Sequence, residues 1–461
     1  MMTHQQSDFL TNSRKKAFDL EHRRKMNHSL KQSDMAFENG KLQFSDLNAA
    51  RNNANKRKWQ TIENLGNYLQ EFEANFLKRG GKIIWSQTGD QALQEILKIC
   101  QQKSAKSIVK SKSMVTEEIH LNEFLLKNKI EVVETDLGEY IQQLDGEAPY
   151  HIVAPSLHKS KEDVARLFHE KLNVAPNLQP EELTLVARDI MRKKYQEAEI
   201  GITGANFLLA DIGGVVVTEN EGNARLSSSF PKTHIVITGI EKVLPSIDDL
   251  ELFLPLLATF GSGQKVTVYN TIFSGPKTKE EVDGPEEMYI ILLDNGRTNI
   301  LADPEVRESL YCIRCGACLN VCPVYKNIGG HAYGSVYSGP IGSVITPHLN
   351  GLAGYKHLSY ASSLCGKCTE VCPVRINLHE LLLINRRKAV EGKNLNRSES
   401  IGWFLWRLAD LNRWMFNIVG GDFKNLLIRN LFKKLWGPNR EFPVFAKRSF
   451  NVLWRKKNKF S

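Results

Sequence analysis

Seven of the eight cysteines in this chain lie in two short runs, and their spacing constrains the fold more than any other feature of the sequence. The first run has the spacing C-x2-C-x2-C-x3-C-P, in which three neighbouring thiolates hold one 4Fe-4S cluster and the fourth reaches across to a second cluster. The second run repeats the last three cysteines and the following proline. The runs comprise Cys312, Cys315, Cys318 and Cys322 before Pro323, and Cys365, Cys368 and Cys372 before Pro373.

The two runs align without a gap, and the second run is one cysteine short because Ser362 stands opposite Cys312. If the runs exchange their last cysteines, as the spacing predicts, the sulfurs divide into a set of four and a set of three. Ser362, Ser363, solvent and a partner's residue are all candidates for the missing ligand, and loss of that iron would give a three-iron form. The predicted ligands are Cys312, Cys315, Cys318 and Cys372 for cluster one, and Cys322, Cys365 and Cys368 for cluster two.

Zinc sites and disulfides are the other uses of closely paired cysteines. A zinc ribbon needs four ligands and would leave three of the seven cysteines without a role, so the pattern favours iron–sulfur clusters and electron transfer. Cysteines gathered in one segment also favour a reducing compartment. The remaining cysteine, Cys100, ends an apolar periodic stretch and is expected to be a small buried core residue.

The 461 residues are enough for two to three domains. The first residues are polar and lack the apolar core of a signal peptide, and no run of eighteen apolar residues predicts a membrane span. We therefore expect a cytoplasmic protein. Residues 1–75 are rich in Lys, Arg, Asn and Gln, which predicts a helical arm with a loose first dozen residues and charges that face solvent.

From 76 to 300, short runs of β-formers alternate with amphipathic helical stretches. This pattern predicts an α/β domain with a mainly parallel sheet covered on both faces. Helices are expected over 90–100 and 116–127. Strands are expected at 82–85, 107–110, 131–134, 150–154, 215–217, 234–238, 266–268 and 289–293.

The cysteine runs belong to a third segment, 301–395, which we expect to be a small helical ferredoxin-like domain. Seven glycines between 329 and 354 predict an irregular linker between the runs. Apolar residues at helical spacing predict a helix over 378–390.

The last segment, 396–461, is a basic tail. Between 386 and 461 there are 18 Lys or Arg and 5 Asp or Glu, so this end of the chain carries the excess behind the net charge of +10. Such a tail suits a membrane interface or an acidic partner; alternatively, its aromatic residues pack on the cluster domain. No nucleic-acid-binding module accompanies it, so nucleic acid is not an expected partner. Its tryptophans are Trp403, Trp406, Trp414, Trp436 and Trp454, interleaved with Arg407, Arg413, Lys433, Lys434, Arg455, Lys456 and Lys457.

A glycine-rich polar stretch in the α/β segment, 202–223, is a candidate small-molecule crevice at the end of a strand. Within it Glu219 and Glu221 flank Asn220, an arrangement that suits general acid–base chemistry or a tight turn. The turn is the favoured interpretation. The chain has no Walker loop, nucleophile elbow or GxGxxG motif, so no bound nucleotide is expected.

The whole arrangement resembles the lactate utilisation protein B family, iron–sulfur proteins of bacterial L-lactate oxidation. The resemblance rests on 201–207 with 218–223, on the two cysteine runs and on 442–455. It implies a non-catalytic electron carrier that works with the other subunits of a three-component system oxidising L-lactate to pyruvate. It also implies an α/β domain similar to sugar-isomerase and CoA-transferase folds, some of which place a catalytic Glu in a Glu-Asn-Gly turn. Here Glu221 replaces that glycine.

Two hypotheses follow. In the first, two 4Fe-4S clusters accept the two electrons of lactate oxidation one at a time, from a donor protein and toward an acceptor protein. In the second, the α/β domain is an enzyme that binds an organic acid or thioester, and the clusters are structural or act as a Lewis acid. The missing cysteine is the best argument for the second hypothesis. A redox sensor is a third interpretation, but no DNA-binding motif supports it.

Overall fold

The computed structural model describes residues 3–392, and in the tail 397–412, 414, 420–427, 429–430, 441 and 444–457. The chain divides into two compact units, one ending at Gly392 and the other beginning at Lys393. The first unit holds the α/β sheet and both cysteine runs. The second is the tail.

The main sheet has six strands in the order β1-β10-β7-β4-β2-β3, and every neighbouring pair is parallel. The predicted mainly parallel α/β sheet is therefore confirmed. Valine and isoleucine dominate the central strands because both faces of the sheet are covered. The strands are β1 (Lys82–Ser86), β2 (Ser107–Lys110), β3 (Glu131–Glu134), β4 (Ile200–Thr203), β7 (Thr233–Gly239) and β10 (Glu287–Leu293).

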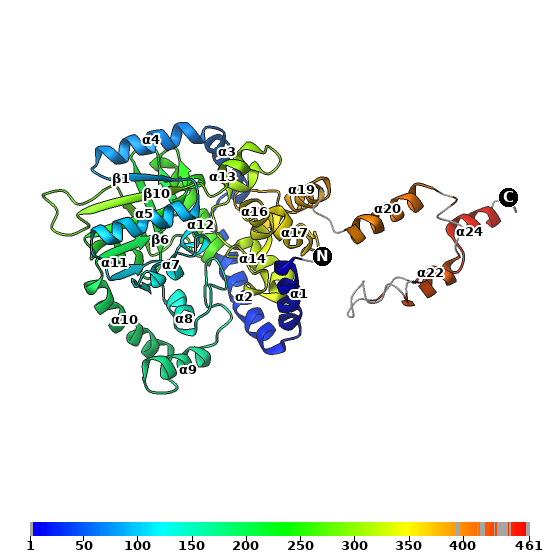
Figure 1. The fold of residues 1–461 in the computed structure, drawn as a ribbon, viewed down its shortest axis with the longest axis horizontal. Coiled ribbons are helices and arrows are strands. Elements are labelled where there is room, and N and C mark those ends of the chain that lie inside the picture. Colours follow the sequence, from blue (N-terminus) through cyan, green and yellow to red (C-terminus); the bar gives the residue numbers. More distant parts are fainter. Residues whose placement is uncertain are drawn as a thin grey trace. The chain divides into compact units, whose positions relative to one another are not determined.

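Helices pack on both faces of this sheet (Figure 1). One face is covered by α5 (Gly89–Gln102) and α7 (Leu121–Lys127). Cys100 lies there at 1% exposure, and burial raises the pKa of its thiol to about 11, so the predicted core position is confirmed. The other face is covered in part by α8 (Leu137–Asp145), α9 (Lys161–Leu172) and α10 (Pro180–Glu197).

A second sheet, which the sequence did not reveal, has four strands in the order β8-β5-β6-β9. The strand predicted at 215–217 belongs to this sheet, where β6 runs antiparallel to β5 and β9. The strand predicted at 266–268 is wrong, because β9 begins one residue later. The four strands are β5 (Phe207–Leu209), β6 (Gly214–Glu219), β8 (Val243–Leu244) and β9 (Tyr269–Phe273).

Two other predictions in the α/β segment are wrong. Residues 150–154 form no strand. Tyr150 is buried, and its carbonyl accepts a hydrogen bond of 2.9 Å from the Tyr325 hydroxyl, so this apolar run packs on the cysteine-bearing segment. The helix expected over 116–127 is divided into α6 (Met114–Glu118) and α7, because His120 adopts a left-handed φ of 54°. The remaining elements are α11 (Asn223–Ser229), η1 (Ile240–Lys242), η2 (Ile247–Asp249), α12 (Leu250–Ser262) and α13 (Arg297–Ala302).

The N-terminal arm is helical, as expected, but it is neither loose at its start nor wholly solvated. Phe9 is buried, with its ring centroid 5.3 Å from that of His357 and 6.0 Å from that of Tyr333. Lys58 is only 1% exposed. The start of the arm packs on the cysteine-bearing segment, whereas Lys58 donates to the carbonyl of Glu241 in the α/β segment at 2.8 Å. Its helices are α1 (His4–Ala17), α2 (Leu20–Lys41), α3 (Leu47–Glu63) and α4 (Leu65–Lys78).

The cysteine-bearing segment is a set of short helices, which confirms the predicted helical domain. The expected irregular linker is wrong in part, because α16 (Gly339–Leu349) occupies its middle. The helix expected over 378–390 is confirmed as α19 (Leu378–Glu391). The other elements are η3 (Arg307–Tyr311), α14 (Ala317–Val321), α15 (Pro323–Ile328), η4 (His331–Tyr333), α17 (Leu352–Tyr360) and α18 (Lys367–Val371).

The tail carries α20 (Arg397–Leu411), α22 (Gly421–Leu427) and α24 (Phe450–Lys457). The tryptophans that the structure describes there, Trp403, Trp406, Trp414 and Trp454, are exposed. Arg413, Lys433, Lys434 and Trp436 lie outside the described residues. Among the described helices of the whole chain, none has the length and apolar character needed to cross a membrane.

Candidate functional site

The two cysteine runs adopt the same local fold. In each run a glycine with φ of 79°, Gly316 or Gly366, precedes a helix of five residues, α14 or α18. Each helix ends at the residue before the last cysteine, Cys322 or Cys372, and proline follows. Glycine is needed at this position because L-residues rarely adopt such a φ. The repeated spacing in the sequence is therefore a repeated structure.

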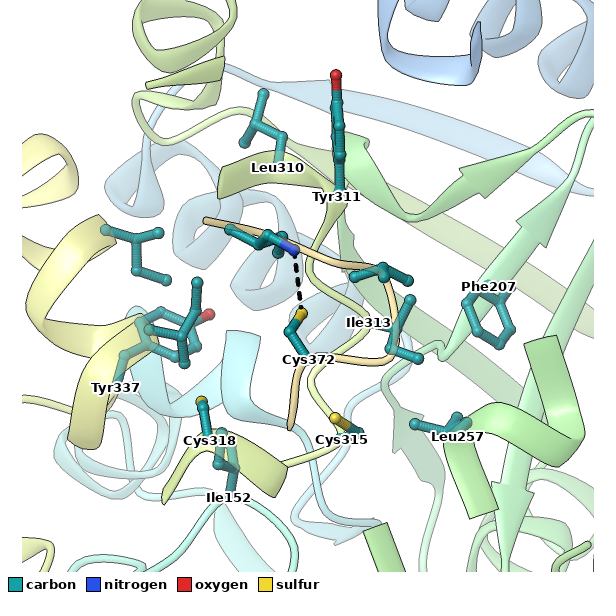
Figure 2. Packing of buried hydrophobic residues seen from close by; sticks show 14 of the residues in the cluster. Ile152, Phe207, Leu257, Leu310, Tyr311, Ile313, Cys315, Cys318, Tyr337 and Cys372 are labelled. Carbon is teal, nitrogen blue, oxygen red and sulfur yellow. Dashed lines mark hydrogen bonds between the residues drawn. The ribbon is translucent and has the colours of Figure 1, made fainter. Parts of the chain in front are cut away.

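The cysteine sulfurs interact in two separate sets. Burial raises the pKa of the Cys318 thiol, and negative charge on Cys312, Cys315 and Cys372 raises it further. The pKa of Cys315 is raised by burial and then by Cys372 and Cys312. Figure 2 shows Cys315, Cys318 and Cys372 together within apolar packing. The last cysteine of the second run thus lies with the first three cysteines of the first run.

The second set contains the other three cysteines of the runs. Burial raises the pKa of Cys368 to about 11. Negative charge on Cys322, and then on Cys365, contributes to this increase. The pKa of Cys322 is raised by burial, with a contribution from Cys365. Cys365 is exposed, so this set lies near the surface, whereas Cys315, Cys318 and Cys372 of the first set are buried.

The positions of these sulfurs fit neither a zinc site nor disulfide bonds. All eight cysteines are free thiols, with no disulfide. Four thiolates at about 2.3 Å from one tetrahedral zinc ion lie about 3.8 Å apart. Among the described residues, which include every cysteine, no three sulfurs lie within 4.8 Å of one another. The larger iron–sulfur cube fits such a set of soft thiolate donors.

Backbone donors reach the first set of sulfurs. The amide of Arg314 donates to Cys312 Sγ at 3.4 Å. The amide of Ile376 donates to Cys372 Sγ at 3.3 Å, and this bond is the dashed line at Cys372 in Figure 2. From α3, Arg51 Nε donates to the carbonyl of Cys372 at 3.1 Å. Such donors stabilise negative charge on cluster ligands and tune their reduction potential.

Three basic side chains, two of them buried and Arg314 half-buried, also act on the first set, and sequence reasoning missed all of them. Burial lowers the pKa of Lys58 to about 7 and that of Lys242 to about 8, while the charge of Glu241 and then that of Cys312 oppose both shifts. Negative charge on Cys312 also helps to raise the pKa of Arg314 against the effect of burial. Of the three, only Arg314 could have been placed near the cysteines from the sequence, because it lies inside a cysteine run. The lysines come from α3 and η1, far away along the chain.

A buried ionic network joins the first cysteine run to the α/β domain. Arg297 Nε donates to Glu241 at 2.7 Å, and both side chains are 1% exposed. The other end of the guanidinium pairs with Glu118 at 2.8 Å, and Glu118 also accepts from the Tyr337 hydroxyl at 2.6 Å. Arg314 reaches Glu241 at 3.4 Å. Because each buried charge has a partner, the network can persist out of water.

A cavity of about 280 Å³ lies between the α/β domain and the first cysteine run. It includes part of the crevice expected from the sequence, and Cys315 lies in its wall. Its lining includes the polar, charged and thiol side chains of Asn206, Glu219, Glu221, Lys242, Arg314 and Cys315.

Glu219 and Glu221 are engaged by backbone amides. The oxygens of Glu219 accept from the amides of Ala224 and Arg225 at 2.6 and 3.0 Å, at the start of α11. Glu221 accepts from the amide of Leu137 at 3.0 Å. Burial, followed by the charge of Asp136, raises the pKa of Glu221 to about 7. These contacts agree with the turn interpretation.

Comparison with known proteins agrees with this arrangement. The LUD domain model matches residues 69–293, and the 4Fe-4S dicluster domain model matches residues 308–376, which carry both cysteine runs. The chain is 50% identical to lactate utilization protein B of Bacillus subtilis (strain 168) over 361 residues, 76% of this chain and 75% of the relative. It is 48% identical to lactate utilization protein B of Geobacillus sp. (strain WCH70) over 440 residues, 91% and 92% of the two chains. A solved structure of a DUF162 family protein from Deinococcus radiodurans matches with a TM-score of 0.29 and 14% identity, over 50% of this chain and 98% of that one. The dicluster match indicates iron–sulfur clusters in the cysteine-bearing segment.

Proposed function

The chain belongs to the lactate utilization protein B family, and we propose that it carries electrons in the oxidation of L-lactate to pyruvate. The names of its relatives support a role in lactate utilisation. The dicluster domain supports a redox role, because iron–sulfur clusters exchange single electrons. The chain has no assigned catalytic residue in this proposal and acts as one component of a lactate utilisation system.

The observation that carries the proposal is the division of the sulfurs into two sets that exchange their last cysteines. We assign the first set to cluster one and the second to cluster two, each a 4Fe-4S cluster. Thiolates are the soft ligands that such clusters require. The ligands are Cys312, Cys315, Cys318 and Cys372 for cluster one, and Cys322, Cys365 and Cys368 for cluster two.

The different exposure of the two sets suggests a direction for the relay. Cluster two, beside the exposed Cys365, is the point of exchange with another protein. Cluster one lies inward, beside the cavity. Lactate oxidation releases two electrons and each cluster takes one, so the pair of clusters can hold both. The basic tail is the segment to which we assign docking, with an acidic partner or the membrane surface as the candidate contact.

Electron paramagnetic resonance tests this proposal on the anaerobically prepared chain. Reduced-cluster signals that require both L-lactate and a cell extract supplying partners are expected for a carrier. Signals with lactate alone would show that the chain oxidises its substrate itself. Absence of reduction under both conditions would show that this protein does not accept electrons from lactate oxidation.

The cavity favours a second candidate, an enzyme whose α/β domain binds an organic acid or thioester. Its wall carries the carboxyl group of Glu221 and the cations of Lys242 and Arg314 beside Cys315, a set of groups suited to an organic anion. In this case Glu219→Gln or Glu221→Gln abolishes turnover while cluster content stays normal. Unchanged lactate oxidation in both variants would exclude the candidate.

A further inference from the structure

The loop before each helix of the cysteine runs has the same unusual backbone conformation. Arg314 in the first loop and Leu364 in the second adopt left-handed φ values of 61° and 53°. Two residues further on, Gly316 and Gly366 both have φ of 79°. Positive φ is rare for a bulky residue such as leucine, so its recurrence at equivalent positions shows a conformation that the surrounding fold imposes. The two loops therefore correspond residue by residue.

The same hydrogen bond closes both loops. In the first loop the amide of Arg314 donates to Cys312 Sγ, two residues earlier, at 3.4 Å. In the second loop the amide of Leu364 donates to Ser362 Oγ, again two residues earlier, at 3.1 Å. The hydroxyl oxygen of Ser362 thus takes the place of the Cys312 sulfur and has the equivalent amide donor.

We propose that Ser362 is the fourth protein ligand of cluster two and binds iron through Oγ, an inference that rests on the proposed two-cluster assignment. The bond between Oγ and iron forms as the hydroxyl proton leaves to solvent, and any solvent molecule on that iron departs. The adjacent Ser363 does not share this arrangement. It corresponds to Ile313 of the first loop, and its side chain is exposed.

Helix α19 fixes the main chain of the proposed ligand. Arg386 Nε donates to the carbonyl of Ser359 at 2.9 Å, and its Nη2 reaches the carbonyl of Ser362 at 3.4 Å. The guanidinium also lies 5.2 Å from the ring centroid of Tyr360. With its carbonyl held by Arg386 and its side chain by the amide of Leu364, Ser362 is preorganised for binding.

The test compares the full-length wild-type chain with Ser362→Ala, Ser362→Cys and the adjacent control Ser363→Ala. Each is prepared anaerobically, and iron per chain and electron paramagnetic resonance spectra are recorded before and after mild oxidation with ferricyanide. Two four-iron clusters give about eight iron atoms per chain. In Ser362→Ala, cluster two is expected to lose one iron on oxidation, with about seven retained, and to give a three-iron signal that the wild type and control lack.

Ser362→Cys supplies a second readout that does not depend on cluster loss. It is expected to keep both clusters and to raise the reduction potential of cluster two, because a thiolate is a softer ligand than an alkoxide. If Ser362→Ala behaves like Ser363→Ala and Ser362→Cys leaves the potential unchanged, Ser362 is not a ligand although the two-cluster relay stands. A wild-type chain with only about four iron atoms would overturn both proposals.

Discussion

Arg51 on the N-terminal arm donates from Nε to the main-chain carbonyl of Cys372 at 3.1 Å, and from Nη2 to the same oxygen at 2.9 Å. From the next turn of α3, Asn55 donates to the carbonyl of Val374 at 2.8 Å. The arm therefore holds the main chain around the cysteine that crosses between the two runs. A segment whose composition suggested a solvated surface therefore supports the main chain around Cys372, a proposed ligand of cluster one.

Replacing Arg51 by Ala is expected to destabilise this region by about 1–3 kcal/mol, because buried carbonyls lose their donor. Thermal unfolding and the rate of iron release from the loaded protein measure the effect. Lys56→Ala on the same helix is the matched control, since its side chain is exposed. Equal iron release from both variants would contradict a supporting role for Arg51.

The crossed ligand assignment predicts which cluster each cysteine variant loses. Cys372→Ala removes cluster one, although Cys372 belongs to the second run, and Cys322→Ala removes cluster two. Alanine is used because serine can itself bind iron. Iron analysis and electron paramagnetic resonance distinguish the two variants. Loss of cluster two in Cys372→Ala would show that the runs do not exchange their last cysteines.

Lys242 is expected to raise the reduction potential of cluster one, because its buried positive charge favours an added electron. The side chain is 6% exposed and has no hydrogen-bond or ion-pair partner among the described residues. Lys242→Met should lower that potential by on the order of 50 mV. Potentiometric titration measures both clusters in one experiment.

Lys326→Met is the control for this effect, since the charge of Lys326 acts on Cys322 of the second set. It should leave cluster one unchanged. A Lys242→Met variant in which both potentials move equally, or neither moves, would show that the charge does not act on cluster one selectively.

The stability of the main sheet should depend on pH through Glu287 at the start of β10. Hydrogen bonds from Lys103, Lys82 and Tyr289 lower the pKa of Glu287 from 4.5 to about 2. Because the folded pKa lies below the unfolded value, the stabilisation is complete above about pH 4.5 and is lost as the pH falls toward 2.

Glu287→Gln should therefore cost about 0.5–1 kcal/mol at pH 7, a small value because Lys82 is half exposed and solvent screens the pair. The difference from wild type should shrink between pH 4.5 and 2. Urea unfolding at several pH values measures it, with Glu286→Gln as the neighbouring control. A difference that does not vary with pH would exclude the ion pairs as its source.

Local spacing and apolar runs in the sequence predicted much of this structure. The loops around Gly316 and Gly366 follow from spacing alone, since each loop and the helix after it are built within a few residues. The strands β1, β2, β3, β7 and β10 follow from apolar runs that only a doubly covered sheet can bury.

The failures come from contacts between distant residues. Lys58 is buried because its ammonium donates to the carbonyl of Glu241 at 2.8 Å, a partner 183 residues away. Helix α16 forms in a glycine-rich stretch where distant parts of the chain pack on it: Asn385, 41 residues from Val344, donates to the carbonyl of Val344 at 2.9 Å, and a Cβ on Gly339 would lie 2.6 Å from the Leu319 side chain. Neither neighbour is visible from local composition.

If both proposed clusters carry the electrons of lactate, each must be reduced and reoxidised while lactate is consumed. Freeze-quench electron paramagnetic resonance of the cluster-loaded chain with its partner proteins, sampled during lactate turnover, measures this. Signals of both reduced clusters should appear within the turnover time and disappear when lactate is exhausted. Accumulation of pyruvate while both clusters stay oxidised, in a preparation whose clusters dithionite can reduce, would contradict it.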